Sequence, residues 1–310
     1  MNKLVVVGDE LAKELAKKIK GKYIPVEERT FPDGEIKPKL KLPIGQRSSV
    51  GLKIKQEEKF KTSILIFQKK EKERINDYLI KFFLLSRKLK DCSKKVIGIM
   101  PYLPYSRQDK LFQEGEPLSA KYIAEVLEGN LDVFITVNMH EHRRTIKDNF
   151  SIPAYNLSIF GLAAKRFLTT KQKGEWIAVG PDKESERFVK DFIKERPIDY
   201  VIFSKQRNVK TGEVSFISPK KDFKGKKVII LDDIASSGLT LIKVAKLIKK
   251  MGAESVGFII CHGLFIEGAL KKLRKLDPFL IAATNTVANP IAVYNIIDVI
   301  SPFLKEQGEL

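Results

Sequence analysis

The stretch Val-Ile-Ile-Leu-Asp-Asp-Ile-Ala-Ser-Ser-Gly-Leu-Thr runs from Val228 to Thr240. Its first four residues are typical of a buried strand, and the residues up to Lys250 have the pattern of a helix. Two acids and a run of small and hydroxyl residues lie between strand and helix. Open parallel sheets bind ligands beyond the carboxyl ends of their strands. The stretch therefore predicts a parallel sheet with a binding site at its edge.

The residue types in this loop suit a sugar phosphate. Asp232 and Asp233 are acceptors when ionised, which suits vicinal sugar hydroxyls or metal-bound water. Backbone N–H groups and hydroxyls at a helix N-terminus attract an anion, and here they come from Ser236, Ser237, Gly238 and Thr240. An ordinary Asp and Ser helix cap is the alternative interpretation. The paired acids at the end of an apolar strand favour the binding loop.

The rest of the chain repeats the same rhythm of short strands and helices. Apolar strand patterns occur at Leu4 to Val7, Ile64 to Phe67, Val96 to Met100, Trp176 to Val179, Tyr200 to Phe203, Val228 to Leu231 and Val256 to Cys261. This alternation predicts an α/β fold of two similar domains, each a mostly parallel sheet flanked by helices. We place the domains at residues 1–149 and 150–310.

Composition predicts a soluble, cytoplasmic protein. The chain has 310 residues, of which 43% are hydrophobic, and this is enough for two globular cores. Its apolar runs are far shorter than the roughly 20 residues that cross a bilayer, and no signal peptide is recognisable. Cys92 and Cys261 are expected to be small apolar core residues.

The net charge of +19 raises the question of nucleic acid. The lysines are interleaved with acids or spaced along helical patterns, which indicates solvated faces. We therefore expect no nucleic-acid partner and no membrane. Small anionic substrates, attracted by the positive field, explain the charge instead.

The loop from Asp232 to Thr240 resembles the phosphoribosyl pyrophosphate-binding loop of phosphoribosyltransferases and ribose-phosphate pyrophosphokinases. Other segments separate the two families. Four motifs occur in the order seen in the pyrophosphokinases: Phe31-Pro-Asp-Gly-Glu35, Pro101-Tyr-Leu-Pro-Tyr-Ser-Arg-Gln-Asp109, Gly115-Glu116 with Ser119-Ala-Lys121, and His140 ahead of Asp148-Asn-Phe150. Simple phosphoribosyltransferases lack this amino-terminal domain. The resemblance spans essentially the whole chain.

The resemblance implies a transferase of nucleotide biosynthesis that uses ATP and ribose 5-phosphate. It would transfer the diphosphoryl group to the 1-hydroxyl of the sugar and release AMP. The residues implied to bind ATP are Phe31, Asp33, Glu35, Arg107, Gln108, Asp109 and His140. In the family the Phe31 segment holds adenine across a subunit boundary, so at least a homodimer is expected. From local sequence alone, this segment is equally well an ordinary turn.

The resemblance also implies a sugar-phosphate site, a metal and two catalytic cations. Ribose 5-phosphate would contact Asp182, Asp232, Asp233, Ser236, Ser237, Gly238 and Thr240. Mg²⁺ would lie near His140 and Asp182, mostly through water. Lys205 and Arg207 would stabilise the transferred group from a mobile loop, although such a pair is often only solvated surface. A zinc site at His140 and His142 is disfavoured because no cysteine cluster accompanies them.

Three departures from the family pattern allow other functions. Leu239 stands where a small residue is usual, Asn138 replaces a more common Asp, and residues 183–186 replace a Gly-containing turn. We expect Leu239 to point away from the phosphate into an apolar niche beside the helix. A catalytically weakened regulatory homologue is the alternative that these changes suggest. A phosphoribosyltransferase is a further alternative, which the amino-terminal motifs disfavour.

Overall fold

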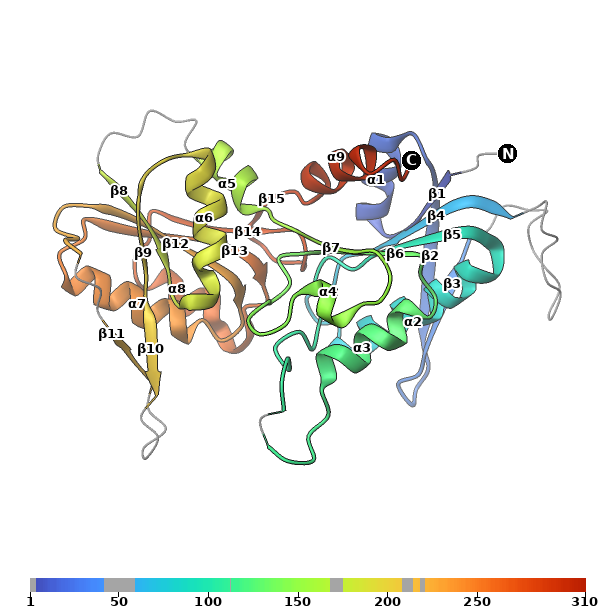
Figure 1. Ribbon diagram of the computed structural model, residues 1–310, viewed down its shortest axis with the longest axis horizontal. Helices are drawn as coiled ribbons and strands as arrows, with labels where there is room; N and C mark the ends of the chain where they lie inside the picture. The colour runs from blue at the N-terminus through green and yellow to red at the C-terminus, as the bar shows by residue number, and fades with distance from the viewer. Residues whose placement is uncertain (1–3, 42–58, 112, 168–174, 208–213, 218–220) are drawn as a thin grey trace. The chain divides into compact units, whose positions relative to one another are not determined.

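The computed structural model describes residues 4–41, 59–111, 113–167, 175–207, 214–217 and 221–310 (Figure 1). They form two compact units. Unit 1 comprises Met1–Leu157 with Ile296–Leu310, and unit 2 comprises Ser158–Asn295.

Unit 1 is built on a seven-stranded sheet in the order β3-β2-β1-β4-β5-β6-β7. The strands are β1 (Leu4–Gly8), β2 (Lys22–Thr30), β3 (Ile36–Leu40), β4 (Phe60–Ile66), β5 (Ser93–Ile99), β6 (Val133–Val137) and β7 (Ala154–Leu157). All neighbours are parallel except β3, which forms an antiparallel hairpin with β2. The helices are α1 (Glu10–Ile19), α2 (Ile75–Cys92), α3 (Ser119–Glu128), α4 (Ile146–Asn149) and α9 (Ile297–Glu306).

The start of unit 1 shows why these residues form these elements. Residues 5–7 of β1 are three consecutive valines without solvent exposure, as expected of a parallel strand covered on both faces. Asp9 then caps α1, because its carboxylate accepts a hydrogen bond from the Leu11 backbone N–H at 3.0 Å. The buried residues of α1 recur every three or four positions, so one face of the helix packs into the core.

Unit 2 is built on a six-stranded, wholly parallel sheet in the order β15-β14-β13-β12-β8-β9. The strands are β8 (Trp176–Gly180), β9 (Asp199–Ile202), β12 (Lys227–Ala235), β13 (Ser255–Gly263), β14 (Leu280–Thr284) and β15 (Ala292–Tyr294). A separate antiparallel ribbon pairs β10 (Ser204–Arg207) with β11 (Val214–Ile217). The helices are α5 (Phe160–Phe167), η2 (Lys183–Ser185), α6 (Glu186–Glu195), α7 (Leu239–Lys250), η3 (Ile266–Gly268) and α8 (Ala269–Arg274).

The two sheets correspond strand for strand. Unit 1 contains the order β2-β1-β4-β5-β6-β7, and unit 2 the order β9-β8-β12-β13-β14-β15. Each unit also has an antiparallel pair of strands early in its chain. In unit 1 the second strand, β2, pairs with β3, and in unit 2 β10 pairs with β11 after the second strand, β9. This confirms the predicted α/β fold of two similar, mostly parallel domains. In this correspondence β4 is equivalent to β12, and the loops that follow these two strands are equivalent as well.

The compact units divide the chain differently from the boundary placed after residue 149. Strand β7 pairs with β6, so unit 1 continues to Leu157. Helix α9 also returns to unit 1, where Asp298 forms an ion pair with Lys18 of α1 and Phe303 packs on Tyr155 with ring centroids 4.8 Å apart. Local sequence patterns cannot predict that α9 packs on unit 1, because the residues it contacts there are distant in the sequence.

The two cysteines were predicted to be small core residues. Cys92 and Cys261 are both buried, as predicted, and burial raises the pKa of each thiol. Within the ranges that the structure describes, no helix is both long and apolar enough to cross a membrane.

Candidate active site

The two acids of the predicted loop lie inside strand β12 rather than after it. The strand was expected to end at Leu231, and it continues to Ala235. The reason is the neighbouring strand β13, which is equally long and pairs Ile260 with Asp232 and Gly263 with Ala235. Asp232 and Asp233 are consequently buried, with exposed fractions of 8% and 6%.

Buried carboxylates are costly unless donors or cations stabilise them. The Asp233 backbone N–H donates to the Asp232 carboxylate at 3.1 Å. Arg187, in the first turn of α6, is close enough to Asp233 for their charges to interact. Burial lowers the pKa of the Arg187 guanidinium, and the Asp233 carboxylate opposes that shift. The acids thus form a compact acceptor site beside a cation.

Helix α7 begins at Leu239, a short loop after the end of β12 at Ala235. Its N-cap is Gly238, which has φ = 71°, a conformation that favours glycine. As a glycine, Gly238 has no side chain with which to cap the first turn. Ser236, Ser237 and Thr240 are half-buried around this turn. The backbone N–H groups of such a helix start, together with the helix dipole, form an anion-binding site.

The prediction that Leu239 packs into an apolar niche is wrong, because the residue is 55% exposed. The buried residues of α7 are Leu241, Val244, Ala245 and Ile248. Leu239 is the first residue of the helix and lies outside this three-and-four spacing. It therefore does not pack between helix and sheet.

Asp182 follows strand β8 and caps the short helix η2. Its carboxylate accepts from the Ser185 backbone N–H at 3.2 Å, and Ser185 is buried. Gly180 is required here, because a Cβ at this position would lie 2.2 Å from the Ser185 hydroxyl oxygen. The Glu186 carboxylate pairs with Lys190 of the next helical turn at 2.8 Å. The turn at 183–186 is thus an ordered cap, and one of its acids is already neutralised.

Lys205 and Arg207 lie on strand β10, whose backbone pairs with β11. They were expected in a mobile loop, and the structure places their backbone in a regular ribbon. Their side chains and residues 208–213 lie outside the described part of the chain.

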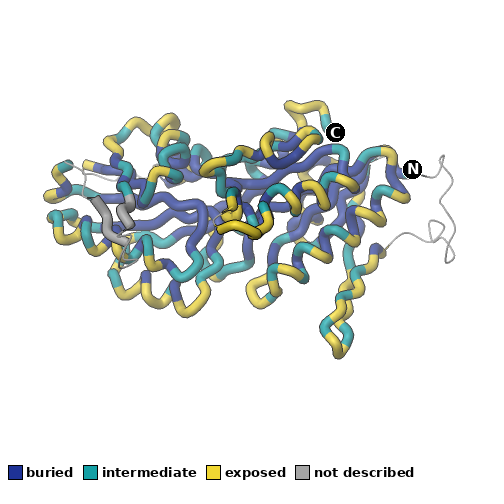
Figure 2. Tube along the Cα trace, turned by 60° about the horizontal axis from the view of Figure 1, so that its bottom comes forward, coloured by how far each residue is buried: buried dark blue, intermediate teal, exposed yellow. Residues whose placement is uncertain are grey.

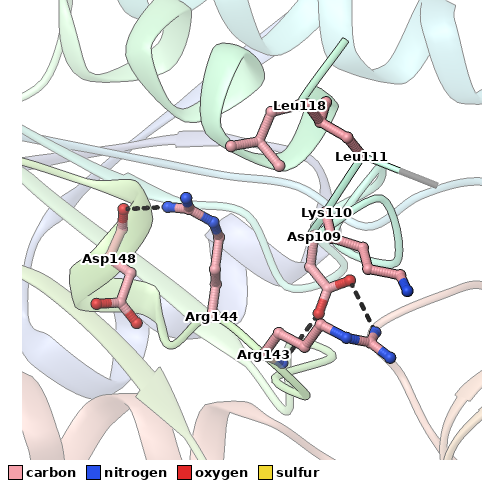
Figure 3. A pocket seen from close by; sticks show the side chains of 7 residues that line it. All are labelled: Asp109, Lys110, Leu111, Leu118, Arg143, Arg144 and Asp148. Carbon is pink, nitrogen blue, oxygen red and sulfur yellow. Dashed lines mark hydrogen bonds and ion pairs between the residues drawn. The ribbon is translucent and has the colours of Figure 1, made fainter. Parts of the chain in front are cut away.

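Unit 1 contains a cavity of about 540 Å³ where two loops meet (Figure 3). The loops follow the adjacent parallel strands β5 and β6. The lining residues are Asp109, Lys110, Leu111, Leu118, Arg143, Arg144 and Asp148. Of the predicted ATP-binding residues, only Asp109 is among these.

The Asp109 carboxylate is engaged within this cavity. One oxygen accepts from the Arg143 backbone N–H at 2.9 Å, and the other lies 3.4 Å from the Arg143 guanidinium (Figure 3). Asp109 is only 4% exposed, so it holds Arg143 in place while its own charge is neutralised. Lys110 and Arg144 add positive charge to the lining, and the cavity therefore suits an anion.

Arg143 and Arg144 were not singled out from the sequence. Arg144 donates to the backbone carbonyl of Asp148 at 3.4 Å. The Asp148 carboxylate forms a capping box with Thr145, and these hydrogen bonds lower the pKa of that carboxyl. The only sequence signal was two consecutive arginines shortly after His140 and His142.

The other predicted residues of the same two loops are described, but they do not line this cavity. Arg107 and Gln108 are exposed, and the Gln108 side-chain oxygen accepts from the Ser119 hydroxyl at 2.6 Å. His140 is half-buried. Asn138 is buried with φ = 41°, a conformation that Asn tolerates better than most residues.

The Phe31-Pro-Asp-Gly-Glu35 segment is the turn of the β2–β3 hairpin, whose outer part is exposed (Figure 2). The Phe31 backbone N–H donates to the Glu35 carbonyl at 2.8 Å, and Gly34 has φ = 96°. The Asp33 carboxylate accepts from the Glu35 backbone N–H at 3.1 Å. The guanidinium of Arg29 lies 5.1 Å from the centre of the Phe31 ring. The local prediction of a turn is confirmed, and it presents an aromatic ring and two carboxylates.

No group of three or more His, Cys, Asp or Glu side chains among the described residues could hold a metal ion alone. His140 belongs to unit 1 and Asp182 to unit 2. Mg²⁺ usually keeps several waters and binds through one or two carboxylates plus substrate phosphates, so it needs no such group of side chains.

The two sheets share one strand order, and the second has buried acids ahead of a helix with a glycine N-cap. These features define a duplicated α/β protein of the phosphoribosyltransferase-like class. The comparisons with known proteins agree. Residues 6–130 match the N-terminal domain of ribose phosphate pyrophosphokinase, and residues 149–278 match the phosphoribosyl transferase domain.

Relatives in other organisms extend the match to nearly the whole chain. A ribose-phosphate pyrophosphokinase of Pyrococcus furiosus is 30% identical over 305 residues, which cover 95% of this chain and 98% of the relative. One from Pyrococcus abyssi is 31% identical over 303 residues, which cover 97% and 98%. The crystal structure of phosphoribosylpyrophosphate synthetase from Mycobacterium smegmatis shares the fold, with a TM-score of 0.80, 20% identity and 99% coverage of both chains. The chain belongs to the ribose-phosphate pyrophosphokinase family of enzymes.

Proposed function

We propose that this enzyme transfers the diphosphoryl group of ATP to the 1-hydroxyl of ribose 5-phosphate, which yields phosphoribosyl pyrophosphate and AMP. The observation that carries the proposal is the buried pair Asp232 and Asp233 in the strand that leads, through a short loop, to the α7 N-terminus. The name shared by the relatives in Pyrococcus supports it.

The sugar phosphate would lie along the end of β12 and the start of α7. The 5-phosphate accepts from backbone N–H groups at the helix start and from the hydroxyls of Ser236, Ser237 and Thr240. The carboxylates of Asp232 and Asp233 accept from the ribose hydroxyls. Because the acids are already buried, a sugar that satisfies them loses little affinity to reorganisation of the site.

ATP would use the cations and the aromatic ring of unit 1. Arg107 is exposed and offers a planar fork of donors that matches phosphate oxygens. Phe31 can stack on the adenine, while Asp33 and Glu35 accept from its exocyclic amine. Gln108, Asp109 and His140 complete the proposed site, with Asp109 acting through Arg143.

Magnesium, when bound, neutralises phosphate charge, and His140 and Asp182 are the residues that would hold it, mostly through water. The protein's task is then alignment and charge stabilisation. The 1-hydroxyl oxygen attacks the β-phosphorus, the bond from that phosphorus to the α-β bridging oxygen breaks with its electron pair left on AMP, and the hydroxyl proton is released to water. Lys205 and Arg207 stabilise the charge on the transferred group.

The direct test is AMP formation from ATP and ribose 5-phosphate by the purified enzyme, without any nucleobase. We expect AMP and phosphoribosyl pyrophosphate in equal amounts. A product that appears only with a base would instead indicate a phosphoribosyltransferase. Absence of turnover by correctly folded protein would favour a regulatory homologue.

Adenine binding across subunits has a separate test. We propose at least a homodimer in which Phe31, Asp33 and Glu35 serve the neighbouring subunit. Inactive Asp33→Ala chains mixed with inactive Lys205→Ala chains should then regenerate some complete sites. Verified mixed oligomers without recovered activity would place the whole site within one chain.

A further inference from the structure

Lys81 is a buried cation in unit 1 that the proposed reaction does not use. It lies on α2 and is only 4% exposed. A lysine is almost never buried to this extent unless it is paired. Its partners therefore indicate what it does.

Two carboxylates and one ring surround the Lys81 ammonium group. It pairs with Glu73 of the loop after β4, and with Glu28 of β2 at 3.1 Å. It also lies 4.7 Å from the centre of the Phe67 ring. Glu73 is fixed from the other side, because its second carboxylate oxygen accepts from the Lys70 backbone N–H at 3.0 Å. Lys81 thus links a fixed loop to the hairpin strand β2.

Glu28 is the point where the outer part of the hairpin is held. The exposed half of β2 begins at Glu27, yet the Glu28 side chain is only 24% exposed because it points to Lys81. Lys70 is also near, with its ammonium nitrogen 3.8 Å from the same Glu28 oxygen. A cavity of about 180 Å³, lined in part by Glu28, Phe67, Lys70 and Lys81, lies at this place. At Glu28 the hairpin is thus joined to the rest of unit 1 by ion pairs beside a cavity.

Arg74, the N-cap residue of α2, also lies near the tip of the hairpin. A Cβ built at Gly34 would lie 3.5 Å from the Arg74 guanidinium. Arg74 is itself held by Asp77, at 2.8 Å. Helix α2 thus contacts the hairpin both at Glu28 and at the turn.

We propose that Lys81 is a positioning residue: through Glu28 it sets the orientation of the β2–β3 hairpin and hence the place of Phe31, Asp33 and Glu35 at the adenine. The inference deepens the proposed function and rests on it. Small errors in the placement of a binding group weaken the interactions that depend on it. Loosening the hairpin should therefore weaken ATP binding while leaving the sugar site unchanged.

Glu28→Gln is the variant of choice, because it removes the pair to the hairpin and leaves Lys81 with Glu73. Glu27→Gln is the matched control. Glu27 is the neighbouring residue on the same strand, but it pairs across the hairpin with Lys39 and Lys41, at 3.9 and 2.7 Å, instead of with α2. Both variants lose one carboxylate charge, but only Glu28→Gln loses the connection to α2.

Two measurements are made on the full-length protein. Hydrogen–deuterium exchange of residues 26–40 reports the hairpin itself, and steady-state kinetics report its use. For Glu28→Gln we expect faster exchange in the hairpin and a KM for ATP raised about three- to tenfold, with kcat and the KM for ribose 5-phosphate within about twofold. Glu27→Gln should change none of these.

Unchanged exchange in Glu28→Gln would overturn the proposed positioning role. Faster exchange with an unchanged KM for ATP would overturn the link to adenine. Phe31→Ala separates this result from a failure of the proposed function: if that variant also leaves the KM for ATP unchanged, the hairpin does not bind the nucleotide at all.

Discussion

The loops after β4 and β12 occupy equivalent positions in two equivalent sheets, but they contain opposite chemistry. Near the end of β12, two buried acids precede a helix whose N-cap is Gly238, with φ = 71°. After β4, the Glu73 carboxylate accepts from the Lys70 backbone N–H and pairs with buried Lys81. The first segment combines acceptor side chains with a helix N-terminus, whereas in the second an acid and a lysine pair with each other.

This difference shows how two domains of the same fold can have different roles. The frame is retained, since Asp9 and Asp182 each cap the helix that follows a glycine-ended strand. In unit 1, the loop after β4 contributes Glu73 to an internal ion pair with Lys81, and this pair can hold the β2–β3 hairpin. The loop of unit 2 keeps the geometry of an anion site. The predictions below test this division.

The largest effect should separate the two hairpins. Lys205→Ala, on the ribbon of unit 2, should lower kcat by ~10²–10⁴ with little change in ribose 5-phosphate binding, because its interaction strengthens only as charge develops. Phe31→Ala, on the hairpin of unit 1, should mainly raise the KM for ATP, by roughly tenfold or more for a lost stacking contact. Steady-state kinetics of both variants give the comparison. Equal effects on kcat would show that the hairpins do not differ in role.

The two loops should respond differently to loss of one charge. Asp233→Asn should weaken ribose 5-phosphate binding by roughly 1.5–3 kcal/mol, as for a hydrogen bond to a charged group. Glu73→Gln should leave that affinity intact and destabilise the fold by about 3 kcal/mol, because Lys81 loses a buried partner. Titration calorimetry and thermal melts measure the two quantities. A loss of sugar affinity in Glu73→Gln would contradict the division.

The backbone of the unit 2 loop should be sensitive to a single methyl group. Gly238→Ala forces a side chain into the left-handed region and should cost roughly 1–2 kcal/mol. A Cβ at this position would come no closer than 3.4 Å to Ala269, so strain rather than collision is the cause. Melts should show the loss, with weaker binding of ribose 5-phosphate. Gly225→Ala is a suitable control, since Gly225 has φ = 69° and no neighbouring atom within 4 Å. It should lose comparable stability without any change in affinity.

The smallest effect is expected at Leu239. The side chain is exposed at the helix start, so Leu239→Gly should cost less than about 1 kcal/mol, the difference in helix propensity. A buried leucine would cost about 2–4 kcal/mol. Thermal melts distinguish these values. Tighter ribose 5-phosphate binding in the variant would show that Leu239 obstructs the loop.

Much of the fold could be predicted from local patterns. The valines of β1 and the stripe on α1 determine their elements through burial and period alone. The limits of β12 were not predictable, because its last residues depend on pairing with β13. Leu239 was expected to be buried because the loop needs its backbone close to the phosphate, but its position at the start of the helix leaves it exposed. The return of α9 to unit 1 likewise depends on distant contacts.

The candidate site was predictable where a motif combined several residue types. The loop from Asp232 to Gly238 was found because acids, hydroxyls and glycine occur together after a strand. Arg143 was missed because its importance comes from contact with Asp109, which lies 34 positions earlier. Lys81 was missed for a similar reason, since a lysine in a helical pattern suggests a solvated face. Only the fold brings it to Glu28 and Glu73.

Titration calorimetry of ribose 5-phosphate in the presence of magnesium tests the division between the two loops most directly. The wild-type enzyme should bind one ribose 5-phosphate per chain. A variant with Asp232→Asn and Asp233→Asn should lose that binding, while Glu73→Gln should bind with wild-type stoichiometry and affinity. Two sites per chain, or undiminished binding by the double variant, would contradict the assignment of the sugar phosphate to the loop after β12.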